Sequence, residues 1–170
     1  MKSTKNQTHT RQSHEFLPVY DKDSKILILG SFPSVKSREI HFYYGHPQNR
    51  FWKLLARLLD CPVPVSIEEK KSMLQTHHIA LWDVIDSCEI IGSSDSSIKN
   101  VTPSDVPMIL QNSQITHVFA NGATAGKLYR KYLQEKTGIE AIVLPSTSPA
   151  NAAYSLDRLA ESWMQIGDFL

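Results

Sequence analysis

The chain has little cysteine, with only Cys61 and Cys88 among 170 residues, and the two form no C-x-x-C pair. Two thiols supply too few ligands for a structural zinc site or an iron–sulfur cluster on their own. The seven histidines show no H-E-x-x-H or other metal-binding spacing, and no carboxylate or thiol completes a ligand set around His77 and His78. We therefore expect no metal, no cofactor and two free, buried thiols.

Long apolar runs are also missing. A run such as Lys25–Leu29 is far shorter than the roughly 20 residues needed to cross a bilayer. Residues 1–14 are polar and lack the apolar core of a signal peptide. We expect an intracellular, cytoplasmic protein with no membrane partner. It would have a flexible polar tail over residues 1–15 and a single domain over residues 16–170.

An excess of charge of one sign is absent as well, because 18 basic and 17 acidic residues leave a net charge of +1. Any surface that binds phosphate must therefore be local rather than global. The sequence contains no G-x-G-x-x-G, no Gly-Lys-Ser/Thr phosphate loop and no G-x-S-x-G. These absences argue against a dinucleotide-binding motif, a Walker-type phosphate loop and the nucleophile elbow of serine hydrolases.

What is present is a regular alternation of short apolar runs and amphipathic segments. Strands are predicted over residues 25–29, 79–85, 117–120 and 141–144, and helices over 49–59, 66–77, 123–134 and 155–170, with another starting near 102–105 and a Ser-rich loop over 88–100. This pattern predicts the α/β class. The architecture would be a three-layer α/β/α sandwich around a central, mostly parallel, four-stranded sheet.

Polar or small residues follow each predicted strand. These strand ends are Gly30-Ser31, Trp82-Asp83, Asn121-Gly122 and Pro145-Ser146. The carboxyl ends of parallel strands lie at one edge of a sheet, and ligands bind at that edge in open α/β folds. We therefore expect distant parts of the chain to form one site there.

Three segments at this edge have a composition that suits a base and a phosphate. The segment 30–34 (GSFPS) can aim backbone N–H groups at an anion or a base edge, although a plain turn also explains it. The segment 42–52 combines three adjacent aromatic residues with Asn49, which also stands where a helix N-cap belongs. The segment 145–151 is rich in hydroxyls that can hold a phosphate or simply cap the last helix.

Together these segments resemble the uracil-DNA glycosylase superfamily, and within it the hypoxanthine-DNA (deoxyinosine) glycosylase branch. Residues 30–34 and 145–151 occupy the places of the first and second motifs of the superfamily, and residues 43–52 (YYGHPQNRFW) are the most branch-specific part. Residues 81–84 and 94–98 also resemble that branch, and the likeness covers residues 16–168. The resemblance implies the same sandwich fold, and an enzyme that flips a damaged nucleotide and hydrolyses its N-glycosidic bond without a cofactor.

Two departures from the superfamily pattern shape the expected site. Phe32 stands where many relatives carry Asp or Asn, and Ser146 aligns with a His of relatives active on uracil. In the hypoxanthine branch an Asn of the Tyr-Tyr-Gly-His-Pro segment is important, which makes Asn49 the expected catalytic residue. The expected base-binding residues are Ser31, Phe32, Phe42, Tyr44 and Asp83, and the expected DNA-phosphate or strand contacts are Ser34, Lys36, Ser146, Ser148 and Asn151.

The expected function is that of a monofunctional DNA glycosylase that starts base-excision repair. Its partner would be double- or single-stranded DNA with a deaminated base, most of all hypoxanthine, with uracil and xanthine as further substrates. We expect a monomer, as in the superfamily. Two alternatives stay open at this point: a hydrolase of nucleosides or nucleotides, and a non-catalytic DNA-damage-binding protein.

Overall fold

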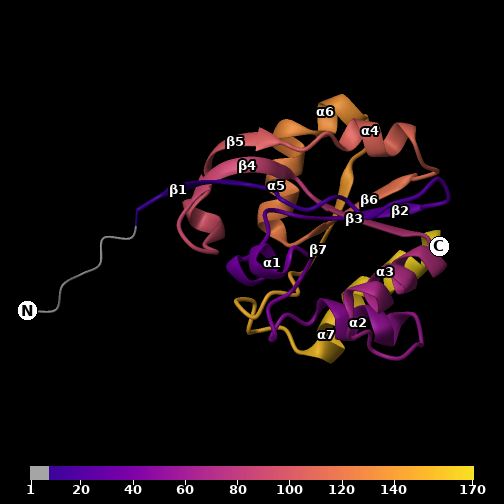
Figure 1. The fold of residues 1–170 in the computed structure, drawn as a ribbon. Coiled ribbons are helices and arrows are strands. Elements are labelled where there is room, and N and C mark those ends of the chain that lie inside the picture. The colour runs from indigo at the N-terminus through magenta and orange to yellow at the C-terminus, as the bar shows by residue number, and fades with distance from the viewer. Residues whose placement is uncertain (1–7) are drawn as a thin grey trace, which may run out of the picture.

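The computed structural model describes residues 8–170 and contains a parallel sheet of four strands. These strands are β2 (Ile26–Gly30), β3 (Ile79–Asp83), β6 (His117–Asn121) and β7 (Ala141–Leu144). Their order across the sheet is β3-β2-β6-β7, and every neighbouring pair is parallel (Figure 1). The predicted α/β class and four-stranded parallel sheet are confirmed.

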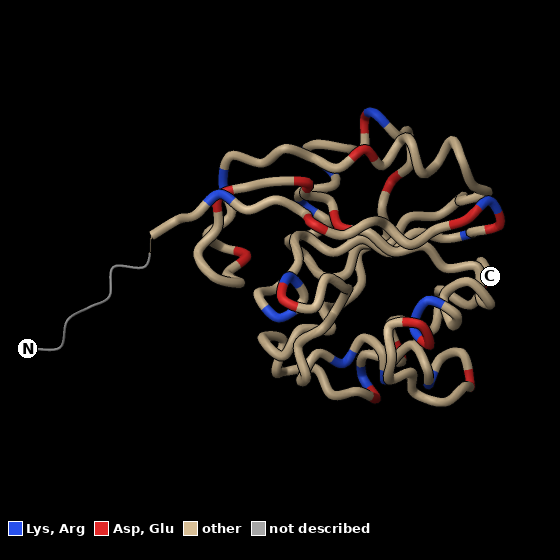
Figure 2. Tube along the Cα trace, in the orientation of Figure 1, with Lys and Arg blue, Asp and Glu red and all other residues tan. Residues whose placement is uncertain are grey.

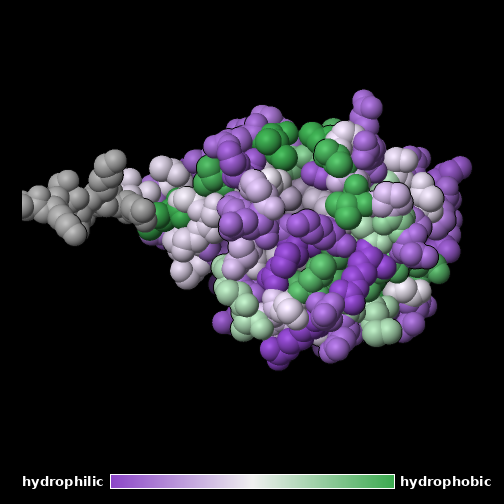
Figure 3. Space-filling model, turned by 90° about the horizontal axis from the view of Figure 1, so that it is seen from below, coloured by the Kyte–Doolittle hydropathy of each residue, from purple (hydrophilic) through white to green (hydrophobic). Residues whose placement is uncertain are grey.

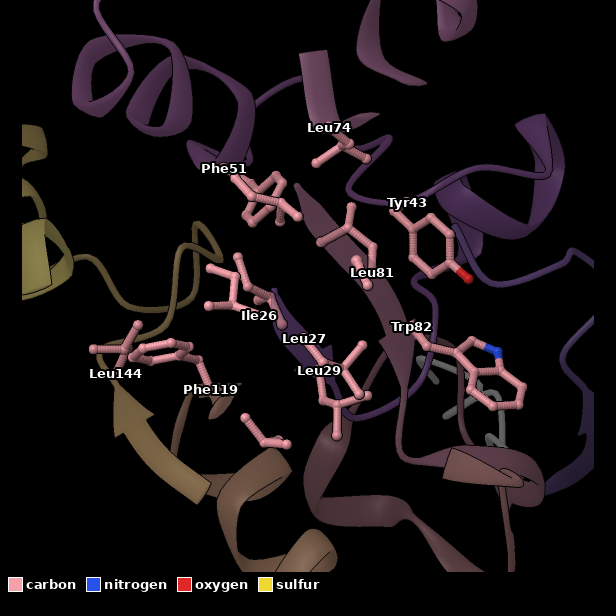
Figure 4. Packing of buried hydrophobic residues seen from close by; sticks show 14 of the residues in the cluster. Ile26, Leu27, Leu29, Tyr43, Phe51, Leu74, Leu81, Trp82, Phe119 and Leu144 are labelled. Carbon is pink, nitrogen blue, oxygen red and sulfur yellow. The ribbon is translucent and has the colours of Figure 1, made fainter. Parts of the chain in front are cut away.

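The centre of the core is β2, whose five residues are all buried. A strand covered on both faces needs apolar side chains at every position rather than at alternate ones, and the run Ile26–Leu29 meets that need. Figure 4 shows side chains of β2 between Phe51 and Leu81 on one side and Phe119 on another. The packed core therefore keeps the carboxyl ends of the strands in fixed positions.

Helices cover both faces of the sheet (Figure 1). One face carries α2 (Phe51–Leu58), α3 (Ile67–Thr76) and α7 (Leu156–Trp163), and the other α4 (Val106–Gln111), α5 (Ala123–Tyr132) and α6 (Gln134–Thr137). The predicted start at Ser66 is confirmed, because its hydroxyl accepts a hydrogen bond from Glu69 N at 3.0 Å. The predicted last helix is shorter than expected, since it gives way after Trp163 to a 3₁₀ segment, η2 (Met164–Phe169).

A second, antiparallel sheet was not expected from the sequence. It consists of β1 (Thr10–Ser13), β4 (Ile85–Ile90) and β5 (Lys99–Pro103), in the order β1-β4-β5, and the short turn η1 (Asp95–Ser97) lies between β4 and β5. The predicted loop over residues 88–100 is therefore wrong at both ends. The predicted tail is corrected over residues 10–13, because a polar segment can serve as an edge strand through its backbone alone. The rest of that prediction, residues 1–7, lies outside the described residues.

Charged residues of both signs are interspersed along the chain (Figure 2). The face seen in Figure 3 is mostly hydrophilic, and its apolar residues form separate groups. Among residues 8–170, no helix is long and apolar enough to cross a membrane. Any surface that binds an anion therefore depends on local groups rather than on a broad basic face.

Candidate active site

A pocket of about 380 Å³ opens at the carboxyl ends of the parallel strands. Most residues that the sequence predicted for the site meet there. The predicted residues that line the pocket are Ser31, Phe32, Ser34, Tyr44, Asn49, Asp83, Ser146 and Ser148. The two motif segments and the aromatic segment thus form one site, although more than 100 positions separate the first motif from the second.

Three predicted site residues lie outside the pocket lining. Phe42 is buried in the core and stacks on Trp52, with 6.0 Å between ring centroids, so its predicted contact with a base is corrected to a packing role. Lys36 projects into solvent and pairs with Glu39 at 3.3 Å. Asn151 donates from its side chain to Ser146 O at 3.0 Å and so shapes the second motif loop.

Asn49 lines the pocket, and the direction of its amide is fixed by the backbone. Its Oδ1 accepts a hydrogen bond from Phe51 N at 3.0 Å and another from Thr147 Oγ1 at 2.9 Å. A backbone N–H can only donate, so the side-chain oxygen must face Phe51. Both lone pairs of that oxygen are then occupied. The N-cap of α2 is Arg50 rather than Asn49, so the expected capping position is off by one residue, although Asn49 still holds the N–H of the first helical residue. The NH₂ group is the part of the Asn49 amide left for a ligand.

Behind Asn49 lies a network that the sequence did not reveal. Thr147 is fully buried, and besides donating to Asn49 it accepts from Asn121 Nδ2 at 3.0 Å. The backbone N–H of Thr147 donates to Asn121 Oδ1, also at 3.0 Å. The end of β6 and the second motif loop thus hold Asn49 in place together. The only sequence signal was the position of Asn121 at a strand end.

The aromatic residues of the pocket differ in how much surface they offer. Phe32 lines the pocket but is only 8% exposed. The ring of Tyr44 is stacked on Phe51, with 4.0 Å between centroids and 23° between planes, so one of its faces is already covered. Tyr44 also has a left-handed backbone, with φ at 53°, which is uncommon for a bulky residue. Burial of its hydroxyl and the nearby Asp83 carboxylate raise the pKa of Tyr44, the side chain of Asn121 opposes the rise, and the phenol stays protonated.

Asp83 is held from behind by a residue of the N-terminal segment. His14 Nε2 lies 2.8 Å from Asp83 Oδ2, and both side chains are almost completely buried. His14 follows β1, whose pairing with β4 brings it to the pocket wall. No sequence signal pointed to His14, because it is separated from Asp83 by 69 positions. The pair fixes one carboxylate oxygen and leaves Oδ1 as the other acceptor.

A second carboxylate, that of Asp95, lines the pocket from the Ser-rich loop. Ser31 Oγ donates to Asp95 Oδ1 at 3.0 Å. Desolvation at the pocket wall raises the pKa of Asp95 above its ordinary value; the hydrogen bond from Ser31 opposes the rise, and the charge of Asp83 adds to it. The loop is also anchored to the helix that follows the first motif, because Val35 N donates to Ser93 Oγ at 2.9 Å and Arg38 Nη2 to Gly92 O at 2.7 Å.

Arg50 organises the second motif loop. Its guanidinium donates to the backbone oxygens of Ser148 and Asn151, each at 3.0 Å, and to that of Tyr154. Its own backbone N–H donates to Thr147 O at 3.1 Å. The charge of Arg50 is thus directed at the protein's own carbonyls, which makes it a structural residue of the site.

The hydroxyls of the second motif loop have hydrogens to spare. Ser146 Oγ accepts from Ser148 N at 3.1 Å, and Ser148 Oγ accepts from Ala150 N at 3.2 Å. Each hydroxyl can still donate its own hydrogen outward. Ser34 is different, because its hydroxyl donates to Ser37 Oγ at 3.1 Å and caps α1 (Val35–Ile40). Ser146 and Ser148 are therefore better placed to bind an anion than Ser34.

The chemistry of the pocket is that of hydrogen bonding and charge. Within residues 8–170, no group of three or more His, Cys, Asp and Glu side chains could hold a metal ion. The groups available are amide and hydroxyl donors, the imidazole of His46 and two carboxylates, with aromatic rings beside them. Such a set can bind a flat, polar ring and stabilise charges that develop on it and beside it.

Comparisons with known proteins agree with this fold and identify the family. The profile of the family described as the Uracil DNA glycosylase superfamily matches residues 17–166. A hypoxanthine DNA glycosylase from Methanosarcina acetivorans is 35% identical over 148 residues, which are 86% of this chain and 92% of that protein. One from Methanosarcina barkeri is 32% identical over 152 residues, covering 88% of this chain and 94% of its own.

A solved structure shows the same architecture. A solution NMR structure from Methanosarcina acetivorans, described as that of a candidate uracil DNA glycosylase, has a TM-score of 0.76 and 33% identity. The match covers 94% of this chain and 95% of the other. The class defined by the fold and the pocket is therefore that of the DNA glycosylases. This chain belongs to the uracil DNA glycosylase superfamily.

Proposed function

We propose that the protein is a monofunctional glycosylase that removes hypoxanthine from DNA, with uracil and xanthine as further substrates, and so starts base-excision repair. The relatives from both Methanosarcina species carry the name hypoxanthine DNA glycosylase, which supports this choice of base. The observation that carries the proposal is the fixed amide of Asn49, whose NH₂ group is free to donate to a base in the pocket. No lysine is among the described residues that line the pocket, which supports hydrolysis rather than Schiff-base chemistry.

In this mechanism the bond between the base and C1′ breaks first, and its electron pair goes to the base. Asn49 Nδ2 stabilises the developing anion by donating a hydrogen bond to it. The carboxylate of Asp95 stabilises the positive charge that develops on the sugar. Water then adds to C1′ and loses its proton. Asp95 brings a carboxylate beside Ser31, the neighbour of Phe32, and so offers an acceptor for that water.

The phosphates that flank the flipped nucleotide need donors at the pocket rim. We assign this role to Ser146 and Ser148, whose hydroxyl hydrogens point to no acceptor in the described part of the chain. Lys36, on the exposed side of α1, can add a charged contact to a more distant phosphate. Binding to the duplex should weaken steeply as salt rises, which binding of a free nucleoside would not do.

The test is single-turnover excision from matched duplexes with deoxyinosine or deoxyuridine, followed by alkali cleavage of the abasic product. N49A is the variant, and N112A is its control, because Asn112 caps the distant helix α4. Product from deoxyinosine that falls at least a hundredfold in N49A alone supports the proposal. Product from deoxyuridine only contradicts hypoxanthine as the main base.

The same purified protein can be tested for the two alternative functions, DNA-damage binding and nucleoside hydrolysis. A DNA-damage-binding protein would shift lesion duplexes on a gel and yield no alkali-labile product. A nucleoside hydrolase would cleave free deoxyinosine, with little dependence on salt because it needs no DNA backbone. Either result would overturn the proposed function.

A further inference from the structure

Two polar atoms of the pocket have no partner that explains them. The hydroxyl of Tyr44 is buried and makes no hydrogen bond of good geometry among the described residues, although the side chain of Asn121 lies close enough to lower its pKa. A buried hydroxyl without a well-placed partner is destabilising, so such groups persist mainly where they serve a ligand. Asp83 Oδ2 is bound by His14, whereas Asp83 Oδ1 is an acceptor that no described residue occupies.

The two atoms converge on one point, the glycine that ends β2. A Cβ atom added to Gly30 would collide with Asp83 Oδ1 and lie 3.3 Å from Tyr44 Oη. Gly30 pairs with Asp83 in the parallel sheet, so the backbone itself sets this approach. Glycine therefore makes room for a hydroxyl and a carboxylate oxygen side by side at the pocket wall.

The two groups differ in what they offer a ligand. The phenol of Tyr44 stays protonated, because burial and the carboxylate of Asp83 raise its pKa, and it can donate a hydrogen bond. The carboxylate of Asp83 can only accept. Side by side, they form a donor next to an acceptor.

We infer that Tyr44 Oη and Asp83 Oδ1 read the lactam edge of the flipped base, the hydroxyl donating to the exocyclic oxygen and the carboxylate accepting from the adjacent ring N–H. The inference rests on the proposed function and names the groups that select the base. Hypoxanthine offers this edge as O6 and N1–H, xanthine offers the same, and uracil offers O4 and N3–H. One pair of groups thus accounts for all three deaminated bases.

Adenine, the parent of hypoxanthine, has the opposite pattern, with an amino group at C6 and a bare lone pair on N1. The hydroxyl of Tyr44 can accept as well as donate, so it tolerates either base. The carboxylate of Asp83 meets a lone pair in adenine and a hydrogen in hypoxanthine. Asp83 therefore discriminates hypoxanthine from adenine, whereas Tyr44 adds affinity for either base. Guanine and thymine share the lactam edge, so their rejection depends on the shape of the pocket around their other substituents.

The experiment compares two bases across three variants in single-turnover excision from the same duplex. The bases are hypoxanthine and unsubstituted purine, which lacks both O6 and the hydrogen on N1. The variants are Y44F, D83N and the control Y132F, which changes a tyrosine on α5 outside the pocket. Comparing the ratio of the two rates cancels the difference in leaving-group quality between the bases.

We expect Y44F to slow excision of hypoxanthine about tenfold and D83N about a hundredfold, as fits the loss of a neutral and of a charged hydrogen bond. Excision of purine should stay within about twofold of wild type in Y44F and should fall less than that of hypoxanthine in D83N. Equal slowing of both bases in Y44F, or no slowing, would overturn the inference alone. Wild-type enzyme that releases neither hypoxanthine nor uracil would overturn the proposed function together with it.

Discussion

The hydroxyl of Thr147 donates to Asn49 Oδ1 at 2.9 Å, although the two residues lie 98 positions apart in the chain. This bond joins the second motif loop to the start of α2. It also decides which end of the Asn49 amide a ligand meets, because it occupies the second lone pair of the oxygen that Phe51 N already holds. The amide that we propose as catalytic is thus oriented by a residue that has no need to touch the base.

Replacing Thr147 with valine should lower the single-turnover rate about tenfold, because the amide of Asn49 loses one of its two anchors. Valine has nearly the shape of threonine and removes only the hydroxyl. The matched variant T147S keeps the hydroxyl and should retain most of the rate. Excision rate and duplex affinity would be measured together. A rate in T147V equal to that in T147S would contradict the positioning role.

Much of the parallel sheet and its helices could be predicted, because a strand buried on both faces is a continuous apolar run, as in Ile26–Leu29. The antiparallel sheet could not. β1 (Thr10–Ser13) is mostly exposed, and β5 (Lys99–Pro103) has no buried residue, so neither shows an apolar pattern. Their pairing depends on backbone hydrogen bonds, which leave little trace in composition.

The same limit applies to the site. Asn49, Tyr44 and Asp83 follow local patterns, either an aromatic segment or a strand end, and the structure places them in the pocket. His14 reaches the site only through the pairing of β1 with β4, and Phe42 leaves it because its ring packs on Trp52. Both outcomes depend on tertiary contacts, which a local pattern cannot encode.

We expect Asp95 to make the excision rate depend on pH in the acidic range. If its ionised carboxylate assists the attacking water, the rate falls as the pH drops through its pKa. Because that pKa is raised, the fall begins at a higher pH than for an ordinary aspartate, whose pKa is about 3.9. D95N cannot titrate, so its profile should lose this step and its plateau should lie roughly a hundredfold below wild type.

Single-turnover rates for D95N and wild type would be measured across the acidic range on deoxyinosine. D157N is the control, because Asp157 forms an exposed ion pair with Arg57 on the far helix α7. A step of unchanged size and position in D95N would show that another group causes it.

The contact between His14 and Asp83 should contribute measurably to the free energy of unfolding. H14A leaves a carboxylate buried beside an empty space, so the free energy of unfolding should fall by about 2–3 kcal/mol. H14Q retains an N–H donor and should recover part of the loss. Urea denaturation of both variants would measure this. Wild-type stability in H14A would mean that the carboxylate finds another partner.

Arg50 allows the structural and the catalytic parts of the site to be separated. R50A removes the donors for the carbonyls of Ser148, Asn151 and Tyr154, and these oxygens cannot all find new partners within the loop. We expect a loss of about 2–3 kcal/mol in the free energy of unfolding. R50K keeps the charge, but a single ammonium lacks the planar fork that spans several carbonyls, so it should recover only a minor share of the lost stability.

Excision by the Arg50 variants would be measured well below the melting temperature of each. There the rate should fall along with duplex affinity, because Ser146 and Ser148 lose their fixed positions. A variant R50A with a disordered loop and undiminished affinity would show that these serines do not bind the phosphates.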